Sequence, residues 1–144
     1  MRIVNRTRGT VIGTQVELAD SLWSRFRGYL GRPEPAEGEG MLLTRCSAVH
    51  MFGMRYPLDI LFLDARGTVI EVAKGLSPWR RTRRIRGARY ALEVRAGTIE
   101  ATGTEAGDGL VWTPPRLMAQ PSVQRSKYTF DSQHDTAAFT PSRR

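Results

Sequence analysis

The chain has 144 residues, 40% of them hydrophobic and 25% charged, a composition typical of a globular domain and not of a disordered or fibrous chain. Its single cysteine excludes an internal disulfide, and no apolar run approaches the roughly 18 residues that a membrane-spanning helix needs. The net charge of +8 is concentrated, because residues 74–95 alone carry eight basic residues and one acid. We therefore expect a cytoplasmic protein with a basic loop rather than a basic body.

The first third of the sequence predicts short strands followed by a helix. Strands are expected at residues 2–4 and 10–18, on either side of a polar turn that contains glycine. A helix is expected over residues 21–30, because Ser21 is a suitable N-cap and apolar residues recur at helical spacing. A glycine and a proline then end it, and the acidic loop of residues 32–40 follows.

The rest of the sequence predicts mainly strands and then a tail. Beyond residue 113, Pro, Ser, Thr, Gln and Arg dominate, which predicts a disordered basic tail over 114–144. Many short strands with closely spaced turns predict one mostly β (α+β) domain over residues 1–113, a compact barrel-like or folded antiparallel sheet with one packed N-terminal helix and a second short helix. The remaining strands are expected at 41–44, 47–54, 58–63, 68–73, 90–94 and 110–112, and the second helix at 96–102.

Five segments, in order along the chain, resemble the motifs of one known family. They are SRFRGYLGR (24–32), EGEGMLL (37–43), HMFGMRYPLDILFLDARGTVIEV (50–72), LEVRAG (92–97) and AGD (106–108). Together they resemble domain of unknown function family 192 over roughly residues 15–112. The resemblance implies a small β-rich barrel with a helix and no established activity, cofactor or substrate. The spacing Cys46-x-x-x-His50 resembles a cytoplasmic-looking branch of that family.

Cys46 and His50 form the first candidate site. On a helix, a spacing of four residues brings two side chains within about 6 Å, so that they could share a metal ion. On a strand, the same spacing separates them by roughly 13 Å. The local composition favours a strand, and zinc would need two further ligands. We therefore expect no metal and no cofactor, with Cys46 acting as a small buried hydrophobe.

Asp59 is the sharper candidate, because it enters an apolar strand where a carboxylate must find a cation or amide donors or be protonated. One interpretation is a ligand-anchoring carboxylate at the mouth of a cleft. The favoured interpretation is an aspartate that accepts backbone N–H groups of the turn before the strand. Arg55 and His50 could reach Asp59, Met54 could line an apolar wall, and Glu93 could face the same pocket.

The segment of residues 79–90 is the strongest signal outside the family motifs. Its arginines, flanked by Trp79 and Tyr90, could neutralise phosphates while the aromatic rings stack on bases. The alternative is a solvated loop whose arginines pair with Glu34, Glu37 and Glu39 of the acidic loop. The polyanion-binding candidates are Arg80, Arg81, Arg83, Arg84, Arg86 and Arg89.

Together these patterns predict a small binding or accessory protein, not an enzyme, that holds a small molecule or a peptide in a cleft near Asp59. One alternative is a hydrolase-like or metal-assisted enzyme that uses Cys46, His50 and Asp59. A second alternative is nucleic-acid or polyanion binding through residues 79–90. The expected partner is an unidentified small molecule or protein, with weak non-specific nucleic-acid binding and no membrane.

Overall fold

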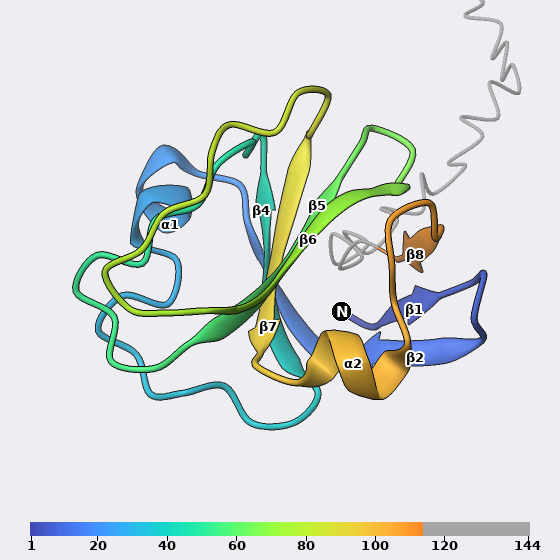
Figure 1. The fold of residues 1–144 in the computed structure, drawn as a ribbon, viewed down its shortest axis with the longest axis horizontal. Helices are drawn as coiled ribbons and strands as arrows, with labels where there is room; N and C mark the ends of the chain where they lie inside the picture. The colour runs from blue at the N-terminus through green and yellow to red at the C-terminus, as the bar shows by residue number, and fades with distance from the viewer. Residues whose placement is uncertain (114–144) are drawn as a thin grey trace, which may run out of the picture.

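A computed structural model describes residues 1–113, so the predicted tail of residues 114–144 lies outside the described residues. Within that range the chain forms two sheets and two short helices (Figure 1). The elements are β1 (Ile3–Asn5), β2 (Thr10–Gly13), β3 (Gln15–Ala19), α1 (Leu22–Arg27), β4 (Glu39–Thr44), β5 (Leu58–Leu63), β6 (Val69–Leu76), β7 (Tyr90–Arg95), α2 (Thr98–Thr102) and β8 (Leu110–Trp112). No helix within the described range is long and apolar enough to cross a membrane.

The larger sheet has the strand order β3-β4-β7-β5-β6, and the smaller one has the order β2-β1-β8. All the pairings are antiparallel except that of β3 with β4, which are joined through α1 and run parallel. The predicted mostly β fold is therefore confirmed. Among residues 1–113 each sheet keeps two edge strands, so it is the folded sheet and not the closed barrel that describes the molecule.

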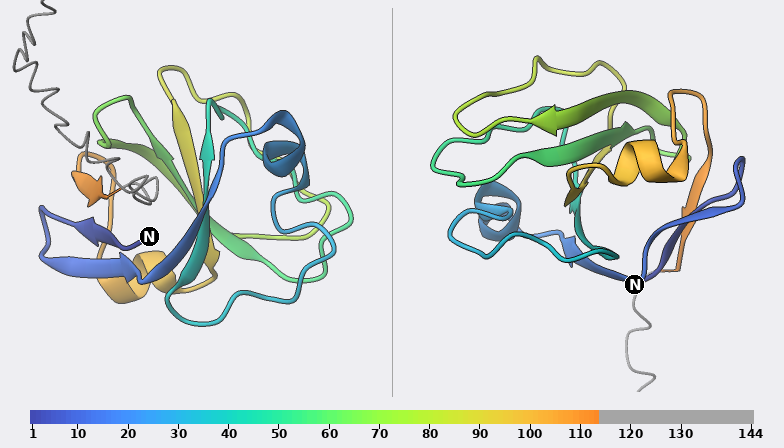
Figure 2. Two further views of the ribbon diagram at one scale, coloured as in Figure 1. Left: turned by 180° about the vertical axis from the view of Figure 1, so that it is seen from behind. Right: turned by 60° about the horizontal axis from the view of Figure 1, so that its bottom comes forward.

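A hydrophobic core lies on each face of the larger sheet. Side chains alternate between the faces of a strand, so along β5 Ile60 and Phe62 pack into one core while Leu61 and Leu63 pack into the other. All six residues of β5 are buried, because the strand is central in the sheet and covered on both faces. Figures 1 and 2 show α1 on one side of this sheet and α2 with the smaller sheet on the other.

The N-terminal helix is shorter than predicted and packs differently. Ser21 caps it by accepting the amide of Ser24, and Gly28 ends it with a φ of 47°, a conformation that favours glycine. None of the six residues of α1 is buried, and Trp23 and Phe26 are 69% and 64% exposed. The apolar residues within α1 are therefore exposed, and only Tyr29 and Leu30, after the helix, pack on the core.

The predicted strand of residues 10–18 is two strands that belong to different sheets. The strand is interrupted at Thr14, where the amides of Thr14 and Gln15 both donate to the carbonyl oxygen of Gly38 at 2.9 Å. β2 then joins the smaller sheet and β3 joins the larger one. This break lets one short stretch of chain connect the two layers.

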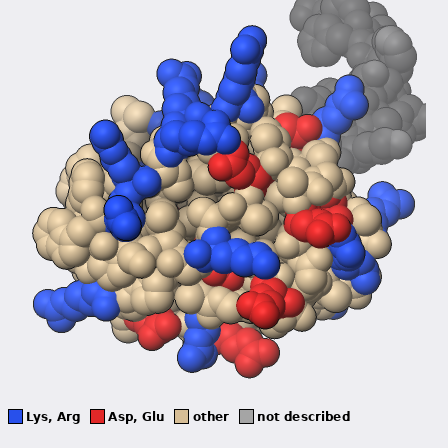
Figure 3. Space-filling view, in the orientation of Figure 1, with Lys and Arg blue, Asp and Glu red and all other residues tan. Residues whose placement is uncertain are grey.

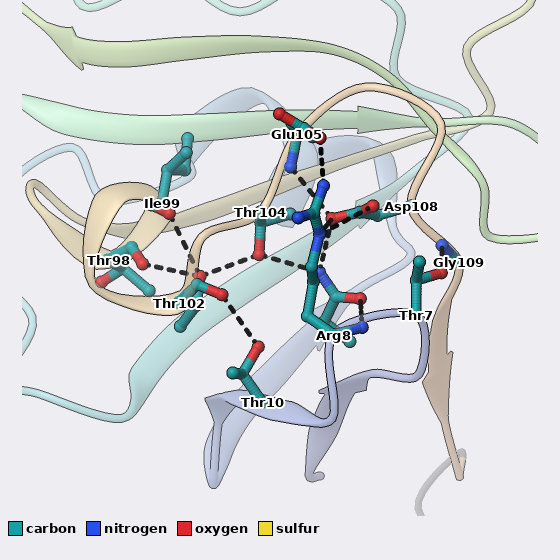
Figure 4. Close-up of polar contacts among 11 residues, drawn as sticks. Thr7, Arg8, Thr10, Thr98, Ile99, Thr102, Thr104, Glu105, Asp108 and Gly109 are labelled. Carbon is teal, nitrogen blue, oxygen red and sulfur yellow. Dashed lines mark hydrogen bonds and ion pairs between the residues drawn. The ribbon is translucent and has the colours of Figure 1, made fainter.

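A buried polar network holds the smaller sheet to the chain after α2 (Figure 4). The Asn5 side-chain amide donates to Thr104 at 3.0 Å and to Asp108 at 2.9 Å, and Arg8 pairs with both Asp108 and Glu105. Burial alone would raise the pKa of Asp108, but the hydrogen bonds from Asn5 and Arg8 outweigh it and hold that pKa below its ordinary value. Asp108 is thus a structural anchor for the end of the domain.

Candidate ligand-binding site

Asp59 is 1% exposed, and its carboxylate is fully engaged by backbone amides. The amide of Gly75 donates to one oxygen at 2.7 Å, and those of Gly97 and Ile99 donate to the other at 3.0 and 2.9 Å. Because the N-cap residue Gly97 has no side chain, Asp59 caps α2 from a neighbouring strand. The donors therefore come from β6 and from the start of α2, and not from the turn before the strand.

The structure places Asp59 and Glu93 on opposite faces of the sheet. Strands β5 and β7 are paired so that Asp59 lies beside Val94, while Ile60 lies beside Glu93. Asp59 shares its face with Leu61 in the core beneath α2, whereas Glu93 shares the face of Ile60 beneath α1. The two carboxylates consequently do not meet in one pocket.

Glu93 instead lies at the floor of a small cavity on the α1 side. The cavity has a volume of about 40 Å³, room for a few water molecules or one small polar group. The end of α1 forms one wall with Gly28, and the segment of residues 46–54 forms the other with His50 and Met54. Three of the predicted ligand-binding residues, His50, Met54 and Glu93, are therefore brought together, and Arg55 lines a neighbouring hollow.

The Glu93 carboxylate is not satisfied by the protein. Glu93 is only 5% exposed, and its Oε2 atom has no hydrogen-bond partner within the described residues. Burial raises the pKa of Glu93 from 4.5 to about 7, and a backbone hydrogen bond from Tyr29 only partly offsets this effect. A Cβ atom at Gly28 would lie 3.1 Å from Oε2, so the glycine leaves room for the carboxylate. The cavity thus presents an unpaired acceptor.

An aromatic row runs past this cavity, and three of its members, Phe26, His50 and Phe52, line it. The row consists of Trp23, Phe26, His50, Phe52 and Trp79, with successive ring centroids 6.4, 5.9, 5.2 and 6.5 Å apart. Both tryptophans are 69% exposed, although large apolar side chains in a monomer are usually covered. A contiguous exposed row of rings next to an unpaired buried acceptor is typical of a binding surface.

The segment of residues 47–54 is not the predicted strand. It follows an irregular path along residues 79–85, with the amide of Met51 donating to the Arg80 carbonyl at 2.7 Å and the amide of Thr82 donating to the Val49 carbonyl at 2.8 Å. Cys46 and His50 both line the cavity, and His50 forms an isolated antiparallel bridge with Arg81. Residues 47–51 therefore lie antiparallel to residues 80–85, but they form no regular strand.

The structure does not assemble the residues of the hydrolase-like alternative. The Cys46 thiol donates to the Ala48 carbonyl at 3.2 Å, and burial raises the pKa of that thiol, which disfavours the nucleophilic thiolate. Asp59 lies across the sheet from both Cys46 and His50. Within residues 1–113, no three His, Cys, Asp or Glu side chains are grouped closely enough to hold a metal ion.

The arginine loop runs beside the same cavity. Arg81, Arg83 and Arg84 line an open hollow together with His50, whereas Arg80, Arg86 and Arg89 lie outside its lining. Figure 3 shows basic side chains gathered over the connection between β6 and β7. Arg83 pairs with Glu71 of β6 at 2.6 Å, so its partner is not in the acidic loop of residues 32–40.

The fold and this cavity define a small, mostly β domain with a cavity lined in part by the aromatic rings of Phe26, His50 and Phe52. A family model for DUF192, described as Uncharacterized ACR, matches residues 3–112, and the chain belongs to this family. It is similar to a UPF0127 protein of Thermococcus sibiricus, with 34% identity over 76% of this chain and 73% of that protein. A UPF0127 protein of Pyrococcus furiosus is 36% identical over 76% of this chain and 97% of its own length.

A solved structure has the same fold. A protein of unknown function from Novosphingobium aromaticivorans superposes with a TM-score of 0.70 and 25% identity, over 78% of this chain and 84% of that one. Four of the segments that resemble the family motifs contribute to the cavity: Gly28 from residues 24–32, Leu43 from residues 37–43, His50 and Met54 from residues 50–72, and Glu93 from residues 92–97. Gly28, Phe26 and Phe52 were not predicted as site residues, although all three lie within segments that resemble the family motifs.

Proposed function

We propose that the protein is a small binding protein that holds its ligand in the cavity between α1, residues 46–54 and β7. A group on the ligand that donates a hydrogen bond pairs with Oε2 of Glu93, and the aromatic row contacts the apolar part of the ligand. The observation that carries the proposal is the unpaired, buried Oε2 atom at the floor of the cavity.

The energetics favour a ligand with a donor group. A buried acceptor without a partner costs roughly 1–3 kcal/mol, and more when it is charged, so a donor that enters the cavity recovers that free energy on binding. Proteins retain such destabilising groups where function requires them. The exposed rings of Phe26 and Phe52 add apolar contact area that the domain itself does not use for folding.

The test uses benzylamine as the probe, because it joins an aromatic ring to a strong hydrogen-bond donor. Titrated into the full chain at pH 8, it should shift the backbone amide resonances of Gly28, Ala48 and Glu93. Glu93→Gln should weaken this binding at least tenfold, and toluene, which has no donor, should leave the same resonances unmoved.

Glu100→Gln is the matched control, because Glu100 is an exposed glutamate on α2, across the sheet from the cavity. This variant should bind benzylamine like the natural chain. The proposal is refuted if benzylamine perturbs none of the three resonances, or if Glu93→Gln and Glu100→Gln bind it equally well.

A further inference from the structure

The arginine hollow borders the cavity at Glu93. Ala48, Val49 and His50 line both of them, so a ligand that lies over this segment would face the Glu93 carboxylate at one end and the guanidinium groups at the other. Along this path, such a ligand would meet a hydrogen-bond acceptor at Glu93, then the aromatic rings, and then the cluster of arginines. A ligand that fits must carry a donor at one end and negative charge at the other.

The two halves of the path are held in a fixed relation by the backbone. The Thr82 hydroxyl accepts the amide of Val49 at 3.0 Å, and the amide of Ile85 donates to the Ser47 carbonyl at 2.7 Å. These bonds tie the arginine loop to the cavity wall on both sides of Arg83 and Arg84. The cation cluster is therefore fixed beside His50 and not carried on an independent loop.

Resting on the function proposed above, we propose that the ligand is a nucleotide, free or within a single strand. An exocyclic amino group on the edge of its base donates to Oε2 of Glu93, its ring lies against His50 and Phe52, and its phosphate binds Arg81, Arg83 and Arg84. Carboxylates accept hydrogen bonds from base amino groups, aromatic side chains stack on bases, and arginine guanidiniums bind phosphate in paired hydrogen bonds.

The size and the charge of the site both support this assignment. The cavity, at about 40 Å³, accommodates a small polar group such as an amino group, which would leave the ring of the base at the level of the aromatic row. A ligand with only negative charge would satisfy the arginines and leave Oε2 unpaired. A simple amine would pair with Oε2 and leave the arginines unused.

The first experiment compares CMP with UMP by calorimetric titration of the full chain at pH 8, above the folded pKa of Glu93 of about 7. Cytosine carries an amino donor where uracil carries a carbonyl oxygen, which would face the Glu93 acceptor unfavourably. CMP should bind at least tenfold more tightly than UMP. In Glu93→Gln this preference should disappear, because an amide can present either a donor or an acceptor.

The second experiment uses two triple variants of the same loop. Arg81→Ala/Arg83→Ala/Arg84→Ala should weaken CMP binding at least tenfold. Arg80→Ala/Arg86→Ala/Arg89→Ala removes the same number of charges, but from arginines outside the hollow. It should change the affinity for CMP less than threefold. Equal losses in the two variants would mean that the net charge alone attracts the nucleotide, and the inference would be overturned.

Further probes distinguish the source of the nucleotide. Tighter binding of a single-stranded oligocytidylate RNA than of CMP would identify a nucleic-acid strand, and equal affinities would identify a free nucleotide; either result supports the inference. Polyglutamate or inorganic phosphate binding as tightly as CMP would overturn it. If benzylamine binds at Glu93 and neither CMP nor the RNA does, the binding function stands and the nucleotide inference fails.

Discussion

Replacing Glu93 by glutamine should stabilise the fold at alkaline pH and not at acidic pH. A carboxyl group whose pKa is raised by folding binds more protons in the folded state than in the unfolded state. The free energy of unfolding therefore falls as the pH rises from the ordinary value of 4.5 through the folded value of about 7. Below pH 4.5 the group is protonated in both states, so Glu93 then carries no such penalty.

The size of the effect follows from the two pKa values. The difference between about 7 and 4.5, at about 1.4 kcal/mol for each pKa unit, corresponds to about 3 kcal/mol above pH 7. Glutamine does not titrate, so Glu93→Gln should gain about 3 kcal/mol over the natural chain between pH 4.5 and pH 8. Between pH 4.5 and pH 8, the melting temperature of Glu93→Gln should therefore rise relative to that of the natural chain by on the order of 10 °C.

Urea denaturation of the two chains at several pH values measures this difference. The buried glutamine amide has its own unfavourable contribution, but that contribution does not depend on pH, so the slope with pH is the relevant quantity. Glu100→Gln, on the exposed surface of α2, should show no such slope. If the natural chain and Glu93→Gln differ by the same free energy at pH 5 and pH 8, Glu93 is not a buried, unpaired carboxylate.

Two further predictions concern the other reactive residues. Asp59→Ala should lower the free energy of unfolding by about 3 kcal/mol, because it leaves the amides of Gly75, Gly97 and Ile99 without their acceptor; a loss below about 1 kcal/mol in urea denaturation would contradict the capping role. Cys46, the only thiol in the chain, should react with iodoacetamide at pH 8 on the order of tenfold more slowly in the folded protein than in concentrated urea, because burial raises its pKa. Equal alkylation rates would show an accessible, activated thiol.

The central strands were predictable because their sequences permit few alternatives. Leu58 to Leu63 is an almost continuous apolar run, as expected for a strand buried on both faces. The turn that follows was predictable for a local reason, because the Asp64 side chain accepts the amides of Arg66 and Thr68 and closes the hairpin without help from distant residues. Local chemistry decides the structure in both places.

Residues 47–54 could not be predicted in the same way. Their composition favours a strand, and residues 47–51 do lie along residues 79–85, roughly 30 residues away in the sequence, but the pairing is irregular and ends at the turn of Phe52 and Gly53. The alternation of side chains along a strand assigns Asp59 and Glu93 each to one face of its strand. It does not predict which face of the sheet is covered by an element that supplies amide donors. Asp59 faces the start of α2, which supplies them, and Glu93 faces a cavity, which does not.

The position of these two carboxylates on opposite faces of one sheet means that selection acts on them in opposite directions. A screen for folding, such as resistance to proteolysis, should deplete substitutions of Asp59 and enrich neutral substitutions of Glu93 at pH 8. A screen for binding should deplete substitutions of Glu93 instead of enriching them, and it should still deplete substitutions of Asp59. Comparing the two screens across every position would therefore separate the scaffold of the domain from its working surface, whatever the ligand turns out to be.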